Sequence, residues 1–197
     1  MLNIGVLVSG GGTNLQAIID ETLSGNINGQ IKVVISNKEN AYGLERAKQN
    51  NIDATYETDE DNIIEILKDK DIDLVVLAGY LKIISPKFVE VFRNKMINIH
   101  PSLIPSFCGK GYYGEKVHQG VIDYGAKVTG ATVHFVDEGA DTGAIIMQET
   151  VMVEDEDDSK SLSEKVLEVE HRILKKSISL FCENKLSIQG RRVFINE

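Results

Sequence analysis

The sequence predicts an α/β fold, in which an open, mostly parallel, twisted sheet carries helices on both faces and gains antiparallel strands toward the C-terminus. The first observation is a set of short runs rich in Val, Ile and Leu at residues 4–8, 31–35, 74–78 and 96–99. The second is the helical spacing of apolar residues between these runs, as at residues 15–19 and 63–67. Near-continuous apolar strands that alternate with helices are typical of a parallel sheet covered on both faces.

The pattern changes after residue 126, which is the third observation. Residues 127–136 alternate between apolar and polar side chains, and a turn at residues 139–143 leads into a further run at residues 144–153. Alternating strands joined by a short connection are typical of an antiparallel pair. We therefore expect this region to extend the parallel sheet with antiparallel strands.

A long helix is expected to follow the antiparallel strands. Ser161 and Glu164 fit a capping box at its start. Apolar residues then repeat at the spacing of a buried helical stripe, at Leu162, Val166, Val169 and Ile173. The acidic residues 154–158 are expected to form a solvated connector before this helix.

The composition predicts one folded domain over residues 1–197. Acidic side chains outnumber basic ones by 30 to 21, which gives a net charge of −9. This balance argues against nucleic acid as a partner, because nucleic-acid binding relies on a basic surface. No apolar run approaches the ~18 residues of a membrane span, and residues 1–8 fit a first strand better than a signal peptide. We expect a cytoplasmic monomer or homodimer that acts on small molecules, without a membrane partner.

A glycine-rich loop follows the first predicted strand and opens the first predicted helix. It is the sequence Ser-Gly-Gly-Gly-Thr-Asn at residues 9–14. Glycines allow the backbone to approach a ligand closely, and the free N–H groups of a helix start attract anions. The loop therefore predicts a phosphate site to which Thr13 or Asn14 can add a donor. A glycine-rich turn with Thr13 or Asn14 as a plain helix cap is the alternative.

Two better-known phosphate loops do not fit these residues. The dinucleotide fingerprint started at Gly10 needs a small residue where Leu15 stands, and the nucleoside triphosphate loop needs a lysine that this region lacks. A phosphate held by backbone N–H groups needs no basic patch, which suits a chain of charge −9.

Asn98 and His100 stand at the end of the fourth predicted strand. Residues two apart share one face of a strand, so both side chains point the same way while Ile97 and Ile99 point into the core. Pro101 ends the strand and leaves the pair at its carboxyl edge, where open parallel sheets bind ligands. A carboxamide N–H can stabilise an oxyanion and an imidazole can move a proton, so the pair suits acyl transfer. A histidine that only caps the strand is the plainer alternative.

The turn at residues 137–143 carries three carboxylates, of which Asp141 is the candidate partner of His100. A carboxylate beside His100 is expected to raise the pKa of the imidazole and favour its protonated form; an ordinary acidic turn is the alternative. Cys108 makes a cysteine–histidine hydrolase a further alternative, although its surroundings lack an activating helix start. His134 is interpreted as structural. No metal is expected, because no set of side chains has metal-ligand spacing.

Taken together, these segments resemble the phosphoribosylglycinamide formyltransferase family (glycinamide ribonucleotide transformylases), folate-dependent enzymes of purine synthesis. The matching segments are residues 8–17, 36–38, 43–47, 77–80, 98–105 and 133–143, in family order over nearly the whole chain. Asn-Ile-His-Pro-Ser-Leu at residues 98–103 is typical of the wider formyltransferase group, including methionyl-tRNA formyltransferase. The loop Ser-Gly-Gly-Gly-Thr-Asn-Leu-Gln at residues 9–16 narrows the resemblance to the ribonucleotide enzymes.

The resemblance implies a Rossmann-like formyltransferase domain. It implies transfer of the formyl group from the cosubstrate 10-formyltetrahydrofolate to the amine of phosphoribosylglycinamide, without a metal. It also implies that Asn98, His100 and Asp141 are catalytic, with the first two stabilising the oxyanion, and that Glu170 contacts the substrate. The other implied contacts are those of the phosphate with Gly12, Thr13 and Asn14, and those of the folate with Leu81, Lys82, Ile83, Ile84 and Asn98.

Two segments depart from the family pattern. Residues 57–62 lack the arginine that the family usually carries on the folate side, and Cys108 stands where a proline is usual. Three alternatives to the implied function stay open at this point. They are a formyltetrahydrofolate hydrolase, a formyltransferase for another amine, and a phosphate-binding module without chemistry.

Overall fold

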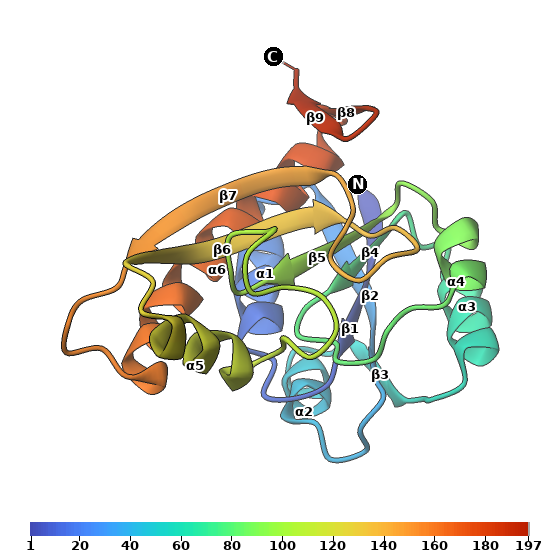
Figure 1. Ribbon diagram of the computed structural model, residues 1–197. Coiled ribbons are helices and arrows are strands. Elements are labelled where there is room, and N and C mark those ends of the chain that lie inside the picture. Colours follow the sequence, from blue (N-terminus) through green and yellow to red (C-terminus); the bar gives the residue numbers. More distant parts are fainter. Residues whose placement is uncertain (197) are drawn as a thin grey trace.

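The computed structural model describes residues 1–196. Within them, a nine-stranded sheet with the order β3-β2-β1-β4-β5-β6-β7-β9-β8 runs through the molecule (Figure 1). The strands are β1 (Leu2–Val8), β2 (Gly29–Ser36), β3 (Asp53–Tyr56), β4 (Leu74–Leu77), β5 (Met96–His100), β6 (Val128–Phe135), β7 (Ile145–Met152), β8 (Leu186–Gln189) and β9 (Arg192–Ile195). The helices are α1 (Thr13–Leu23), α2 (Tyr42–Gln49), α3 (Glu60–Asp69), α4 (Pro86–Val91), α5 (Glu115–Tyr124) and α6 (Ser159–Cys182).

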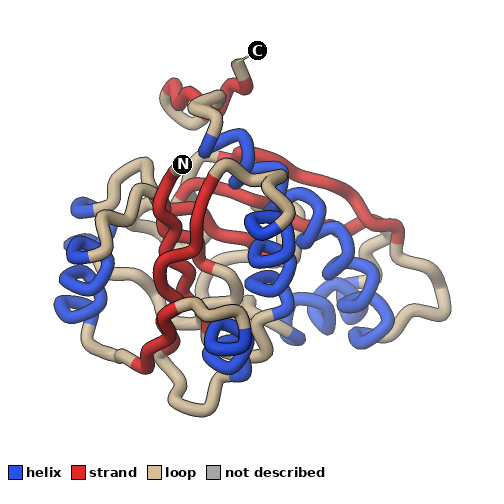
Figure 2. Tube along the Cα trace, turned by 180° about the vertical axis from the view of Figure 1, so that it is seen from behind, coloured by secondary structure: helices blue, strands red, loops and turns tan. Residues whose placement is uncertain are grey.

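The predicted fold class is confirmed by the pairing of the strands. Strands β1 to β5 pair in parallel, whereas β6 pairs antiparallel with both β5 and β7. The four expected apolar runs form the mostly buried strands β1, β2, β4 and β5. The short strands β3, β8 and β9, which the apolar pattern did not predict, all retain exposed positions. The β8–β9 hairpin projects beyond the body of the sheet (Figure 1, Figure 2).

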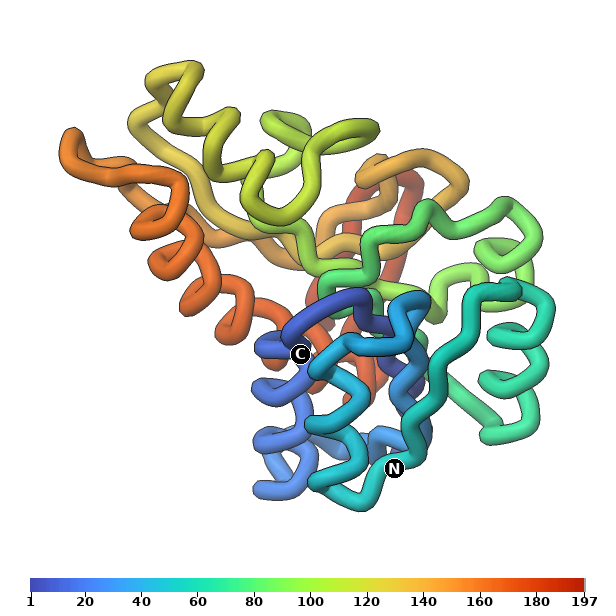
Figure 3. The backbone as a smooth tube through the Cα atoms, turned by 90° about the horizontal axis from the view of Figure 1, so that it is seen from below, coloured from blue at the N-terminus to red at the C-terminus, as the bar shows by residue number. Residues whose placement is uncertain are grey.

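Helices cover both faces of the sheet, as predicted (Figure 2). One hydrophobic cluster joins Leu15 of α1, Leu44 of α2 and Ile173 of α6 to one face of the strands. A second cluster joins Leu67 of α3 and Phe88 of α4 to the other face, and Figure 3 shows α3 on the opposite side of the strands from α1. None of the helices within residues 1–196 combines the length and apolarity needed to cross a membrane.

The order in which strands join the sheet reverses at β1. Strands β2 and β3 lie on one side of β1, and β4 and β5 lie on the other. In open α/β sheets such a reversal leaves a crevice at the carboxyl ends of the strands. The glycine-rich loop follows β1, residues 78–84 follow β4, and His100 ends β5. The fold therefore gathers these candidate segments at one edge of the sheet.

The start of α6 differs from the predicted capping box. Asp158 is the N-cap residue, because its carboxylate accepts the N–H of Ser161 while Ser161 Oγ accepts the N–H of Asp158. The predicted pairing of Ser161 with Glu164 is therefore wrong, since a carboxylate three residues earlier makes the reciprocal bonds. The connector is solvated as expected, since residues 154–156 and 158 are exposed, and Asp157 forms a 2.7 Å ion pair with Lys165 of α6. The predicted buried stripe of α6 is confirmed.

Candidate active site

Strand β5 brings Asn98 and His100 to the edge of the sheet. Ile97 and Ile99 are buried in the core on one face of the strand, so the two polar side chains lie on the other face. His100 is the last residue of β5, and Pro101 follows it. The histidine is only 4% exposed, so its imidazole interacts with protein groups and with the pocket that it lines.

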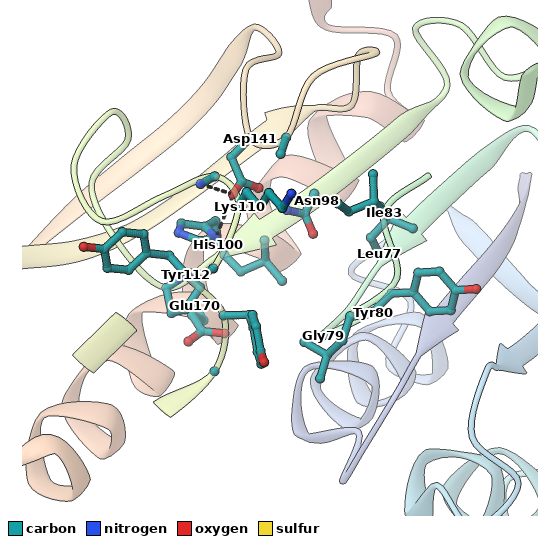
Figure 4. A pocket seen from close by; sticks show the side chains of 18 of the residues that line it. Leu77, Gly79, Tyr80, Ile83, Asn98, His100, Lys110, Tyr112, Asp141 and Glu170 are labelled. Atoms are coloured by element: carbon teal, nitrogen blue, oxygen red, sulfur yellow. Dashed lines mark hydrogen bonds and ion pairs between the residues drawn. The ribbon is translucent and has the colours of Figure 1, made fainter. Parts of the chain in front are cut away.

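Asp141 joins this pair from the turn between β6 and β7. Its φ of 58° is a left-handed conformation that is uncommon for residues other than glycine. Its Oδ2 lies 3.6 Å from His100 Nδ1 and accepts a 2.8 Å hydrogen bond from the N–H of Gly109. Its Oδ1 lies 3.5 Å from Asn98 Nδ2. Asn98, His100 and Asp141, far apart in the sequence, thus form one cluster (Figure 4).

His134 completes the cluster from strand β6, where it pairs directly with Asn98. Its Nδ1 lies 2.8 Å from the carbonyl oxygen of Phe135, which only accepts hydrogen bonds, so Nδ1 carries the proton of the neutral ring. Its Nε2 therefore accepts a 3.1 Å hydrogen bond from Asn98 Nδ2. His134 thus orients the Asn98 amide. The interpretation of His134 as structural missed this contact, which depends on a strand register that the sequence did not provide.

The surroundings of His100 determine which ring nitrogen can act as a base. Its Nε2 lies 3.0 Å from the carbonyl oxygen of Phe107 and must donate to it. In the neutral ring the lone pair is then on Nδ1, on the side of Asp141. Burial lowers the pKa of His100 and outweighs the opposing influences of the Asp141 charge and the Phe107 carbonyl. The Asp141 carboxylate therefore acts in the expected direction on the pKa of His100, but the protonated form is not favoured, because desolvation exceeds the attraction of the carboxylate.

A pocket of about 880 Å³ lies against this cluster. In Figure 4, Asn98, His100 and Asp141 lie above Glu170 at the lower left and above Gly79 and Tyr80 at the lower right. The predicted folate residues all line the pocket, namely Leu81, Lys82, Ile83, Ile84 and Asn98. Lys110 and Tyr112, which the sequence reasoning did not single out, line it from the loop before α5.

Glu170 connects the pocket to the glycine-rich loop. This residue of α6 lines the pocket, is 9% exposed, and accepts a 2.7 Å hydrogen bond from Asn14 Nδ2 of α1. Burial raises the pKa of Glu170 to about 7, against the opposing effect of the Asn14 hydrogen bond. Burial thus favours the protonated form of the carboxyl group, and its Asn14 partner holds it in place.

The glycine-rich loop leaves the first turn of α1 without a cap. Gly12 is the N-cap residue, with a φ of 70°, and no side chain makes a capping hydrogen bond. The alternative of Thr13 or Asn14 as a plain helix cap is therefore wrong. Within residues 1–196, none of the backbone N–H groups of residues 10–15 donates a hydrogen bond. Gly12, Thr13 and Asn14 do not line the 880 Å³ pocket; the loop adjoins it through the bond between Asn14 and Glu170.

Cys108 does not have the surroundings of a nucleophile. Its Sγ donates to the carbonyl oxygen of Pro105 at 3.3 Å, and burial together with the Asp141 charge raises the pKa of the thiol. Since the thiolate is the reactive form, this position disfavours a cysteine–histidine hydrolase. In the part of the chain that the structure describes, no group of three or more His, Cys, Asp or Glu residues is arranged to hold a metal ion.

Comparison with known proteins identifies the family. The formyl transferase model matches residues 2–178, which is most of the chain. The chain belongs to the formyl transferase family. Among solved structures, glycinamide ribonucleotide transformylase 1 from Symbiobacterium toebii superimposes with a TM-score of 0.94 at 42% identity, covering 100% of this chain and 95% of that one. This agreement supports both the family and the sheet order described above.

Two curated relatives of the chain are covered to different extents. Phosphoribosylglycinamide formyltransferase from Haemophilus influenzae is 41% identical over 206 residues, an alignment that covers 100% of this chain and 94% of the relative. The chloroplastic phosphoribosylglycinamide formyltransferase from Vigna unguiculata is 38% identical over 192 residues, covering 93% of this chain. The present chain spans only 62% of that plant protein.

Proposed function

We propose that the chain transfers the formyl group of 10-formyltetrahydrofolate to the amine of phosphoribosylglycinamide, a reaction of purine synthesis. The observation that carries this proposal is the cluster of Asn98, His100 and Asp141 against a pocket that reaches Glu170. The names of the bacterial and plant relatives support the same substrate. A cytoplasmic location and a monomeric or homodimeric state stay predictions from the sequence.

The segment after β4 suits the folate cosubstrate. Residues 79–84 have irregular backbone, and none of the N–H groups of Lys82, Ile83 and Ile84 donates a hydrogen bond within the described residues. A flat heterocycle with several donors and acceptors fits such a backbone, while the exposed Leu81 and Ile83 offer apolar contact. We assign Leu81, Lys82, Ile83, Ile84 and Asn98 to this cosubstrate.

The glycine-rich loop and Glu170 suit the two ends of the amine substrate. The uncapped N–H groups at Gly12, Thr13 and Asn14 can bind its phosphate. Glu170, bonded to Asn14, lies between this loop and the catalytic cluster and can accept a hydrogen bond from the rest of the substrate. A phosphate at the loop would therefore place the amine on the His100 side of the pocket.

The cluster can perform the required proton and charge movements. 10-Formyltetrahydrofolate supplies a formyl carbon bonded to a nitrogen; a new bond forms from the substrate amine to this carbon, and the bond to the folate nitrogen breaks. Asn98 Nδ2 donates one hydrogen to His134 Nε2. Its second hydrogen has only a 3.5 Å contact with Asp141 Oδ1, so it can be donated to the negatively charged formyl oxygen. His100 Nδ1 can take the proton that the amine loses and return it to the departing folate nitrogen. Between these two proton transfers, Asp141 stabilises the imidazolium.

Product analysis tests the proposal. The purified protein is incubated with 10-formyltetrahydrofolate and phosphoribosylglycinamide, and both formylated ribonucleotide and free formate are measured. The proposal predicts formylated ribonucleotide in amounts equal to the tetrahydrofolate released. Formate alone would mean a hydrolase, and binding of the ribonucleotide without any product would mean a phosphate-binding module. A formylated product only with a different amine would mean another acceptor.

A further inference from the structure

Two carbonyl groups of the glycine-rich loop accept hydrogen bonds from helix α2. Arg46 Nε donates a 2.8 Å hydrogen bond to the carbonyl oxygen of Gly11. The backbone N–H of Gly43 donates a 3.0 Å hydrogen bond to the carbonyl oxygen of Gly10. Two successive peptide oxygens of the loop are therefore turned toward α2.

The contact between α2 and the loop is close and well supported. A Cβ atom on Gly12 would lie 2.8 Å from Gly43 Cα, so the two backbones are nearly in contact. The Arg46 guanidinium donates a second hydrogen bond to Gln16 Oε1 at 3.2 Å and stacks over Tyr42, with 5.0 Å from its central carbon to the ring centroid. Arg46 is thus held by contacts with the loop, with α1 and with Tyr42 of its own helix.

These two hydrogen bonds determine where the N–H groups of the loop point. In a trans peptide the C=O of one residue and the N–H of the next point in opposite directions. Because the oxygens of Gly10 and Gly11 face α2, the N–H groups of Gly11 and Gly12 face away from it. These N–H groups donate no hydrogen bond within residues 1–196, and neither do those of the uncapped first turn of α1. Buried Asn14 Oδ1 in that turn also has no partner there.

We propose that Arg46 is a positioning residue for the phosphate of the substrate, acting through the Gly11 carbonyl. The inference rests on the proposed function, since it assumes that a phosphate monoester binds at the glycine-rich loop. Arg46 holds the peptide plane between Gly11 and Gly12, so that the loop presents its N–H groups before the ligand arrives. Preorganised donors bind more tightly because no free energy is lost in arranging them.

Two substitutions separate positioning from direct charge attraction. The Nε2 atom of glutamine follows the same number of side-chain atoms as the Nε of arginine, so R46Q can keep the hydrogen bond to Gly11 without the positive charge. R46M removes both the donor and the charge while retaining an unbranched side chain. Lys48→Met on the same helix controls for the loss of one positive charge, because this exposed side chain pairs, among residues 1–196, only with Glu45.

The experiment measures the Kd of ribose 5-phosphate by calorimetry and the steady-state constants for formyl transfer. We expect R46M to raise this Kd and the KM for phosphoribosylglycinamide about tenfold, as for the loss of one hydrogen bond to a charged group. R46Q and K48M should stay within about threefold of the wild type. The KM for 10-formyltetrahydrofolate and the kcat should be unchanged in all three variants, and their thermal midpoints confirm folding.

Equal weakening in R46Q and R46M would overturn the proposal, because the charge itself would then attract the phosphate. Unchanged binding in R46M would overturn it as well, because the loop would hold its shape without Arg46. A wild type that fails to bind ribose 5-phosphate overturns the phosphate site and the role of Arg46 together. A wild type that binds ribose 5-phosphate but transfers no formyl group contradicts the proposed function alone, and the Kd values still decide the role of Arg46.

Discussion

Replacing Glu170 with glutamine should stabilise the protein at alkaline pH and not at acidic pH. The carboxyl group is 9% exposed, and its burial raises its pKa from 4.5 to about 7. Below pH 4.5 the group is protonated in both the folded and the unfolded chain. Between pH 4.5 and about 7 it ionises in the unfolded chain only, so stability falls as the pH rises. Glutamine cannot ionise, and its Oε1 can still accept the hydrogen bond from Asn14 Nδ2.

The size of the effect follows from the two pKa values. A change from 4.5 to about 7 corresponds to about 3 kcal/mol at ~1.4 kcal/mol per pKa unit. Urea unfolding should therefore show Glu170→Gln more stable than the wild type by about 3 kcal/mol at pH 8, and by under about 1 kcal/mol at pH 5. The thermal midpoint at pH 8 should rise by about 6–12 °C for a protein of this size.

A control variant on the same helix tests whether the burial of Glu170 causes the gain in stability. Glu164 is exposed, and Glu164→Gln should leave the difference from the wild type close to zero at both pH values. The reasoning is refuted if Glu170→Gln gains nothing at pH 8, or if it gains the same amount at pH 5. Because we assign Glu170 to the substrate, we also expect the stabilised variant to lose formyl transfer activity.

Three further predictions concern the loop and the histidines. Gly12→Ala should lower the free energy of unfolding by about 1–3 kcal/mol in urea, because Gly12 has a φ of 70° and an added Cβ would lie 2.8 Å from Gly43 Cα; unchanged stability would contradict this. Burial lowers the pKa of His118 from 6.5 to about 4, so stability should fall as the pH drops through this range, and His118→Leu should remove that part of the fall in a urea series. Asp141→Asn should lower the pKa of His100 further, since the Asp141 charge opposes the effect of burial. The acid limb of kcat/KM should move to lower pH in this variant, and a shift to higher pH would contradict the assignment.

Local patterns were sufficient for the parts of the fold that depend on nearby residues. The buried runs of β1, β2, β4 and β5 are nearly all apolar, so their composition alone indicates strands covered on both faces. The edge strand β3 has no buried position and therefore carries no such signal. The sequence does not determine the start of α6, because Asp158 and Ser161 both suit an N-cap and only the hydrogen bonds distinguish them.

The part of the candidate site that lies on one strand was predictable from the sequence. The contacts between distant segments were less predictable. Asn98 and His100 share a face of β5, which the alternation of side chains gives directly. The contact of Asn98 with His134 depends on the antiparallel register between β5 and β6. The lowered pKa of His100 depends on its burial, and the role we propose for Arg46 depends on how α2 packs against the loop. Neither packing effect can be derived from spacing along the chain.

The rate of formyl transfer in Asn98→Ala and His100→Ala tests the central claim most directly. Single-turnover reactions with 10-formyltetrahydrofolate and phosphoribosylglycinamide at saturating concentrations report the chemical step, and circular dichroism confirms that both variants are folded. The account predicts that each substitution slows transfer by about 10²–10³-fold, as expected when a donor to the developing negative charge or the proton-transfer group is removed. Transfer at the wild-type rate in either folded variant would contradict the assignment of these two residues.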